Sequence, residues 1–176
     1  MSSKGGPRAA GTDGSDFQHR EQVASQYKTS VQLKSKFRTC LYINILVVLI
    51  QVVMFAGAHF HIIPSDFYPS PWQYTWMLSG VVSLIGLNAL AKNKKEMLSL
   101  HDLGLTIFGF GGIFFGFTSQ YSSHQRYIAS GETKRIADIP LHYIWVFVLA
   151  SNAINYLATY VYSIRLKAAW NVRKTR

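Results

Sequence analysis

The sequence has 176 residues, of which 18 are Lys or Arg and 8 are Asp or Glu, so its formal net charge is +10. Hydrophobic residues make up 49% and aromatic residues 14%, which is too apolar for a typical soluble domain of this size. A strongly basic chain can bind nucleic acid, but these basic residues flank apolar stretches and no recognised nucleic-acid-binding motif occurs, so we exclude that class of partner. The single cysteine, Cys40, excludes an intramolecular disulfide and a cysteine-based zinc site.

Four stretches of the chain contain no Asp, Glu, Lys or Arg. They cover residues 39–65, 67–91, 103–125 and 139–164. About 20 apolar residues let a helix cross the hydrocarbon core of a bilayer, where it satisfies its own backbone hydrogen bonds. The sequence therefore predicts an all-α, polytopic membrane protein, with a four-transmembrane-helix bundle in residues 40–163 and the lipid bilayer as its main partner. The expected spans are residues 40–63, 72–91, 100–119 and 141–162.

Positive charge is sorted between the connections of these spans. Seven basic residues precede the first stretch, three lie at positions 92–95 and five follow position 164, whereas three lie between the third and fourth stretches. Cytosolic connections carry the excess of Lys and Arg in membrane proteins. The asymmetry of 15 against 3 predicts that both termini and the loop at 92–95 face the cytosol.

The segment before the first span has two parts. Residues 1–14 are rich in Gly, Ser and Ala and predict a disordered terminus. A cytosolic amphipathic helix is expected over residues 15–39, since Ser15 and Gln18 have capping-box spacing. It would lie on the bilayer surface, or alternatively be a solvated cytosolic helix. The expected membrane-interface residues on its apolar face are Phe17, Tyr27 and Val31. No apolar signal-peptide region occurs, so the first span is expected to act as an uncleaved anchor.

Span one carries a cysteine at one end and two histidines at the other. Cys40 lies at the cytosolic edge, where a cysteine is a candidate for lipidation by a palmitoyl group. The alternative is a small buried apolar residue. His59 and His61 lie two residues apart at the lumenal end and on different helix faces. Because metal-binding pairs on a helix prefer a spacing of four, we expect neither a metal nor another cofactor.

Aromatic residues and glycines mark the next two spans. Aromatic residues are enriched at membrane interfaces, which predicts an interfacial belt at the lumenal start of span two. These residues are Trp72, Tyr74 and Trp76. Small residues in span three would let helix backbones approach closely. They are Gly109, Gly112 and Gly116. We favour packing within the bundle over a homo-oligomer as their role. A lumenal loop is expected from about Ser119 to Pro140.

The polar residues inside the spans are amides rather than acids or bases. They are Asn44, Gln51, Asn88, Asn152 and Asn155. Hydrogen bonding between helices is the expected role for such amides. No Ser/His/Asp set, Cys/His pair or pair of intramembrane carboxylates is evident in the sequence, so no catalytic residue is predicted.

Residues 164–176 form a basic tail that is expected to be cytosolic. Arg173 and Lys174 stand fourth and third from the end of the sequence. Basic residues at these positions resemble the dibasic ER-retrieval signal that the COPI coat recognises, which is an address read by a receptor. The alternative is a positively charged flank of span four.

Two segments carry a resemblance to a known family. The run GPRAAGTDGSDFQHR begins at Gly6, and WQY begins at Trp72, followed by SLIGL from Ser83 and by Lys92-Asn93. These motifs, the four-span layout and the dibasic end resemble the Jagunal family of ER membrane proteins, which often has an acidic residue where Gln73 stands here. The resemblance implies an ER-resident protein with cytosolic termini, acting in ER organisation and vesicle-mediated transport, with family links to oocyte ER and neutrophil differentiation.

Two functions are compatible with these observations. The first is a non-enzymatic ER membrane protein for ER organisation and vesicle-mediated transport in the early secretory pathway, retrieved through its dibasic tail. The alternative is a small membrane-embedded enzyme or transporter that acts on lipid or a small solute through His59, His61 and Asn44. We favour the first, because the polar residues of the spans do not converge on a reactive pair in the sequence.

Overall fold

The structure is a computed structural model that describes residues 15–63, 68–131, 135–136 and 138–171, with side chains from Tyr27 to Trp170. It contains four helical segments that are long and apolar enough to cross a membrane, which confirms the predicted all-α, four-span fold class. They are Tyr27–His59, Pro71–Lys92, Lys95–Ser130 and Leu141–Trp170. The predicted disordered terminus, the side chain of Phe17 and the dibasic pair Arg173 and Lys174 lie outside these described residues.

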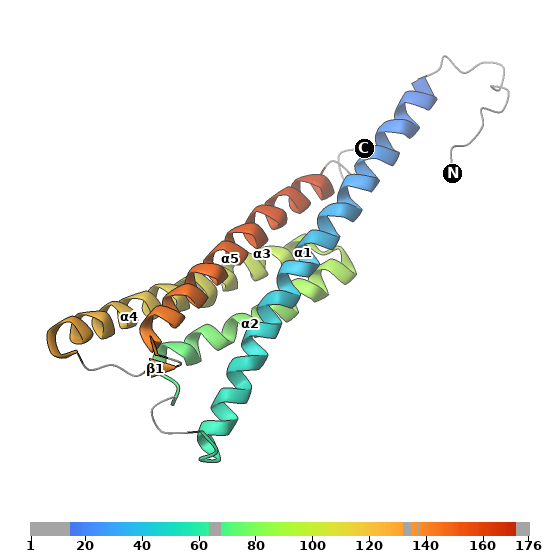
Figure 1. Ribbon diagram of the computed structural model, residues 1–176. Coiled ribbons are helices and arrows are strands. Elements are labelled where there is room, and N and C mark those ends of the chain that lie inside the picture. The colour runs from blue at the N-terminus through green and yellow to red at the C-terminus, as the bar shows by residue number, and fades with distance from the viewer. Residues whose placement is uncertain (1–14, 64–67, 132–134, 137, 172–176) are drawn as a thin grey trace.

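Helix α1 (Ser15–His59) is a single 45-residue helix. At 1.5 Å per residue it is about 68 Å long, more than twice the roughly 30 Å core of a bilayer. Its N-terminal part extends beyond the other helices in Figure 1. The expected amphipathic segment and span one are therefore continuous. Tyr27 and Val31 are exposed, and the contact of this segment with the bilayer surface stays a prediction.

Helix α2 (Pro71–Lys92) has clear signals at both ends. Pro71 occupies its first turn, where a missing N–H costs nothing. The Oε1 atom of Gln73 accepts a hydrogen bond of 3.0 Å from the backbone N–H of Ser70, as in a capping box. Asn93 adopts a left-handed conformation (φ 51°) and ends the helix. The chain then turns sharply, so that α2 and the third span become antiparallel neighbours.

The third span is one long helical segment with a local irregularity. It comprises α3 (Lys95–Gly104), the π-helical η2 (Leu105–Phe110) and α4 (Gly111–Ser130). Gly131 ends it at φ 70°. The lumenal loop expected from about Ser119 is thus helical up to Ser130. Its hydroxyl side chains satisfy nearby carbonyls: Ser130, for example, donates to the backbone O of Arg126 at 2.9 Å. Polarity marks where lipid contact ends, not where the helix ends.

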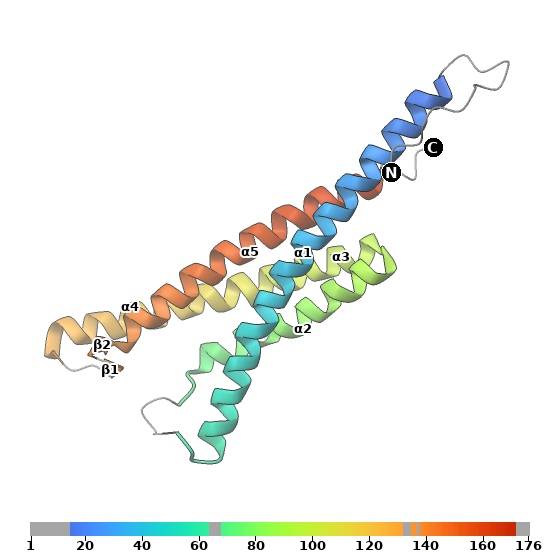
Figure 2. The same ribbon diagram turned by 45° about the vertical axis from the view of Figure 1, so that its right-hand side comes forward.

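A short hairpin precedes the last helix. Strands β1 (Arg135–Ile136) and β2 (Ile139–Pro140) pair antiparallel, and α5 (Leu141–Asn171) follows directly. Helix α5 packs against α1 and α4, and α2 packs against α1 and the third span. Figures 1 and 2 show α5 beside α1 near the end that carries Lys92–Lys95, whereas α1 diverges from α4 and α5 at the other end. We call these the charged end and the hairpin end.

Two groups of buried side chains hold the bundle together. The group at the charged end includes Phe37, Leu41, Leu98, Leu166 and Trp170. The group at the centre includes Trp72, Trp76, Leu105, Leu149 and Tyr156. The outward face between the two ends is apolar, since Val53, Phe114 and Phe147 are each about two-thirds exposed or more. Such a surface is stable only where lipid rather than water surrounds it.

Candidate functional site

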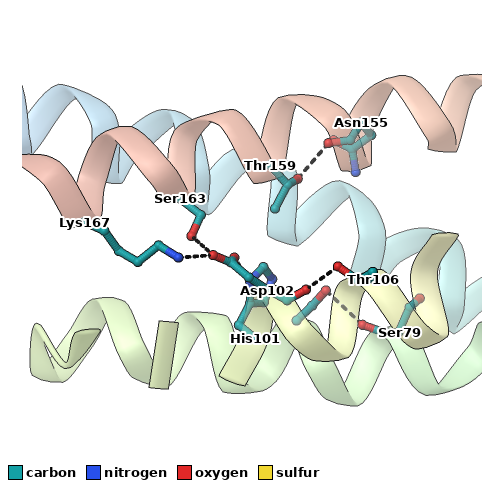
Figure 3. Close-up of polar contacts among 9 residues, drawn as sticks. Ser79, His101, Asp102, Thr106, Asn155, Thr159, Ser163 and Lys167 are labelled. Atoms are coloured by element: carbon teal, nitrogen blue, oxygen red, sulfur yellow. Dashed lines mark hydrogen bonds and ion pairs between the residues drawn. The ribbon is translucent and has the colours of Figure 1, made fainter. Parts of the chain in front are cut away.

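A buried carboxylate near the charged end joins the third span to α5 (Figure 3). One oxygen of Asp102, Oδ2, accepts hydrogen bonds from Ser163 Oγ at 2.7 Å and from Lys167 Nζ at 2.6 Å. Ser163 and Lys167 are four residues apart, so they lie on one face of α5. Only 8% of the Asp102 side chain is exposed. A charge inside a membrane protein needs a partner of opposite sign, and Lys167 supplies it.

His101 extends this cluster toward the other two helices. Its Nδ1 atom lies 3.1 Å from Oδ1 of Asp102, and the ring is fully buried. The ring meets Phe37 of α1 edge to face, with centroids 5.3 Å apart. On α2, a Cβ atom at Gly86 would lie 2.7 Å from the imidazole Cδ2, so the absence of a side chain there admits the ring. His101 and Asp102 therefore link all four spans at one level.

The cluster brings together Ser163, His101 and Asp102, a set that the sequence did not reveal. Its geometry is not that of a catalytic triad, in which the serine bonds to the histidine and the histidine to the carboxylate. Here Ser163 and His101 both bond to Asp102. The Nε2 atom of His101 is buried without a hydrogen-bond partner among the described residues. The arrangement orients helices and offers no activated nucleophile.

A spacing signal could have revealed the cluster. Asp102 stands at the edge of one charge-free stretch, and two basic residues, Arg165 and Lys167, follow the edge of another. Of these two, Lys167 is four residues from Ser163 and therefore lies on the same face of the helix. An acid and a base at the same membrane level are natural partners. From the sequence, Lys167 was expected only to contribute to the cytosolic charge, so its pairing with Asp102 was not predicted.

A second polar network lies at the bundle centre, between α1, α2 and α5. The amide of Asn44 donates to Ser83 Oγ at 2.6 Å and to the backbone O of Ser79 at 3.1 Å. Tyr156 donates its hydroxyl to Asn44 Oδ1 at 2.8 Å and accepts from Trp76 Nε1 at 2.8 Å. The expected role of Asn44 in bonding between helices is confirmed.

The other predicted amides differ in their contacts. Asn155 of α5 donates to the backbone O of Cys40 on α1 at 3.2 Å, which is an interhelical bond. Asn152 bonds to Val148 O within its own helix. Asn88 is exposed. Gln51 is buried, and both polar atoms of its amide lack a hydrogen-bond partner in the described part of the chain.

The three predicted packing glycines face other helices of the same chain. A Cβ atom at Gly112 would lie 2.8 Å from Trp76 Cα, so α4 and α2 touch backbone to backbone there. A Cβ atom at Gly116 would lie 2.9 Å from Leu149 of α5, and one at Gly109 would lie 3.0 Å from the Tyr156 ring. These close approaches are all made within the chain.

The predicted aromatic belt divides between the inside and the outside of the bundle. Trp72 and Trp76 are 7% and 0% exposed, and their rings stack at 5.8 Å. Their spacing of four residues places both on the face of α2 that packs inward, so they do not face lipid. Tyr74, on the opposite face, is 53% exposed. Cys40 is partly buried, and its lipidation stays a prediction.

The histidines proposed for an enzyme or transporter do not meet Asn44. His59 and His61 are exposed at the far end of α1, and His61 Nδ1 lies 2.8 Å from the Tyr68 hydroxyl. Fifteen residues separate His59 from Asn44, which is about 22 Å along a helix. No group of three or more metal-ligating side chains occurs among the described residues. The residues named for that alternative thus form no common site.

Comparison with known proteins points to one family. A family model described as "Jagunal, ER re-organisation during oogenesis" matches residues 1–174. The chain is 35% identical over 137 residues to "Protein jagunal homolog 1" of Bos taurus, covering 77% of this chain and 75% of that protein. It is 30% identical over 182 residues to "Protein jagunal homolog 1-B" of Danio rerio, covering 97% and 94%. "Protein jagunal" of Drosophila melanogaster is 29% identical over 131 residues, covering 69% and 66%. None of these names denotes an enzyme.

Proposed function

Because the chain belongs to the Jagunal family, we propose that it is a non-enzymatic, multi-pass ER membrane protein that acts in ER organisation and in vesicle-mediated transport through the early secretory pathway. The observation that carries this proposal is the family match over residues 1–174, whose description names ER re-organisation. The interior agrees with it, because the polar clusters join helices and expose no reactive group. Its working surfaces are then the segments outside the bilayer.

The charged end of the bundle faces the cytosol in this proposal. Support comes from the 15 basic residues of the termini and of the loop at 92–95, against three between the third and fourth spans. In sealed microsomes, a protease added outside should remove a tag fused to the N-terminus and should leave a tag inserted in the lumenal connection after α1 intact. Protection of the N-terminal tag would contradict this orientation.

In this proposal the C-terminal segment carries the ER-retrieval signal. Helix α5 ends at Asn171, so Arg173 and Lys174 follow it within three residues. The last turns of α5 are fixed, since Lys167 bonds to Asp102 and Trp170 is 7% exposed. This anchoring fixes the end of α5 that precedes the dibasic signal, and we expect the COPI coat to read that signal.

Replacement of both basic residues by serine tests the proposed ER-retrieval signal. Full-length chain with Arg173→Ser and Lys174→Ser should move from the ER to the Golgi or the cell surface, as seen by co-localisation with compartment markers. The matched control is Arg176→Ser, which removes one charge from the same tail and leaves the third and fourth positions intact. We expect that control to stay in the ER. An unchanged ER pattern in the double variant would remove the retrieval mechanism.

A further inference from the structure

A cavity of about 1130 Å³ lies at the hairpin end of the bundle and takes no part in the proposed function. Its lining comes from α1, α2, α4, β1 and α5. Figures 1 and 2 show that α1 diverges from α4 and α5 at this end of the bundle. The volume slightly exceeds the range of about 300–1,000 Å³ that is typical of small-molecule pockets. The cavity therefore suits a ligand larger than an ordinary metabolite.

The polar part of this cavity favours an anion. Arg126 of α4 and Arg135 of β1 line it, and none of the described lining residues is acidic. Two long helices also begin there, since Ser70, just before α2, and Leu141, the first residue of α5, belong to the lining. The N-terminus of a helix carries a partial positive charge. Two cationic side chains and two helix N-termini thus converge on one space.

Gln120 of α4 adds an uncharged polar group to the same lining. Only 7% of this residue is exposed. A side-chain amide carries both donors and an acceptor, so Gln120 can bond to a phosphate or ester oxygen of a ligand.

The cavity also has an apolar part, formed by side chains of α1 and α5. Val47, Ile50 and Met54 of α1 face Ile144 and Val148 of α5 across it. Ile50 is 55% exposed, so this part of the wall borders the surrounding bilayer. One continuous space therefore has a cationic end at the membrane surface and an apolar arm at the depth of the acyl chains.

We propose that this cavity binds one anionic phospholipid taken from the bilayer. Its headgroup phosphate pairs with Arg126 and Arg135, and one acyl chain lies along Val47, Ile50 and Val148. A basic pocket between membrane helices is a known chemistry for charged headgroups. A zwitterionic lipid such as phosphatidylcholine has no net charge, whereas phosphatidylserine keeps a net negative charge because its carboxylate offsets its ammonium group. A free phosphate leaves the apolar arm unfilled. Both the zwitterionic lipid and free phosphate should therefore bind more weakly than the anionic lipid. The proposal is independent of the address in the C-terminal tail.

A titration of the purified full-length chain in mild nonionic detergent tests the site. Four probes are compared: dioleoylphosphatidylserine, dioleoylphosphatidylcholine, dihexanoylphosphatidylserine and inorganic phosphate. Binding is read as bound mass by native mass spectrometry. We expect one dioleoylphosphatidylserine per chain and at least about tenfold weaker binding of each other probe, corresponding to a loss of at least 1.4 kcal/mol.

Two variants locate the binding. Arg126→Gln with Arg135→Gln should weaken dioleoylphosphatidylserine binding about tenfold, because it removes both cationic side chains. Both arginines are exposed, so the fold should persist. Arg165→Gln, at an exposed arginine of the charged end, is the matched control and should bind as before. Equal binding of the two dioleoyl lipids, or binding unchanged by the double variant, would overturn the proposal, as would phosphate binding as tightly as the lipid.

Discussion

Replacement of Asp102 by leucine is expected to lower the free energy of unfolding by about 3 kcal/mol, at the lower end of the range for removing one partner of a buried ion pair. Lys167 would keep its charge without a counterion, and Ser163 and His101 would lose their acceptor. We expect a loss at the lower end of this range because the Lys167 side chain is 29% exposed, so water can solvate its charge in part. Thermal unfolding of the purified chain in detergent measures the change.

Two further variants separate the ion pair from a general effect of charge removal. Glu96→Leu removes an exposed acid from the same helix and should change stability by no more than about 0.5 kcal/mol. Asp102→Leu combined with Lys167→Met leaves no unpaired charge and should recover most of the loss. If Asp102→Leu unfolds at the same temperature as Glu96→Leu, the carboxylate does not hold the third span to α5.

Gly112→Val is the second substitution with a large expected effect. The first atom of any side chain at this position would lie 2.8 Å from Trp76 Cα and 2.9 Å from Trp76 Cβ. A backbone cannot rotate away as a side chain can, so α4 and α2 must separate. Overpacking of this kind costs about 1–3 kcal/mol and sometimes more. The unfolding temperature in detergent should fall, and the yield of folded chain with it.

The neighbouring glycine supplies a matched control. At Gly111 the nearest atom to an added Cβ is Thr106 O, at 4.0 Å, so Gly111→Val should change stability little. Gly116→Val should lie between the two, since its close contacts are with the side chains of Leu149 and Trp72, which can shift. A change of oligomeric state in Gly112→Val with no loss of stability would contradict packing within the chain and would favour the homo-oligomer.

The four spans could be predicted from the sequence because charge and hydropathy decide which segments enter lipid. Charge-free stretches such as residues 39–65 need no knowledge of any neighbour. The same signal failed to give the extents of the helices. Helix α4 continues to Ser130, because hydroxyl groups and backbone bonds satisfy a helix equally well outside the lipid.

The contacts between helices were less accessible to prediction. Trp72 and Trp76 are residue types that are typical of a membrane interface. They lie inside the bundle because of the rotation of α2 about its own axis, which the sequence does not reveal. The pairing of Asp102 with Lys167 likewise depends on the axial register of the third span against α5. Hydropathy reports depth in the membrane, whereas rotation and register depend on the partner helix. The role of Asn44 in hydrogen bonding between helices could be predicted, because an amide side chain inside a membrane-spanning helix needs a hydrogen-bond partner.

One kinetic measurement tests the central claim, that this chain serves ER organisation and transport through its cytosolic segments and not by catalysis. It is the rate at which a secretory cargo leaves the ER in cells that lack the chain and are supplied with full-length variants. We expect the unaltered chain and the His59→Ala, His61→Ala double variant to restore the same rate, and the Arg173→Ser, Lys174→Ser double variant not to restore it. Loss of restoration in the histidine variant at normal level and location, or full restoration by the tail variant, would contradict it.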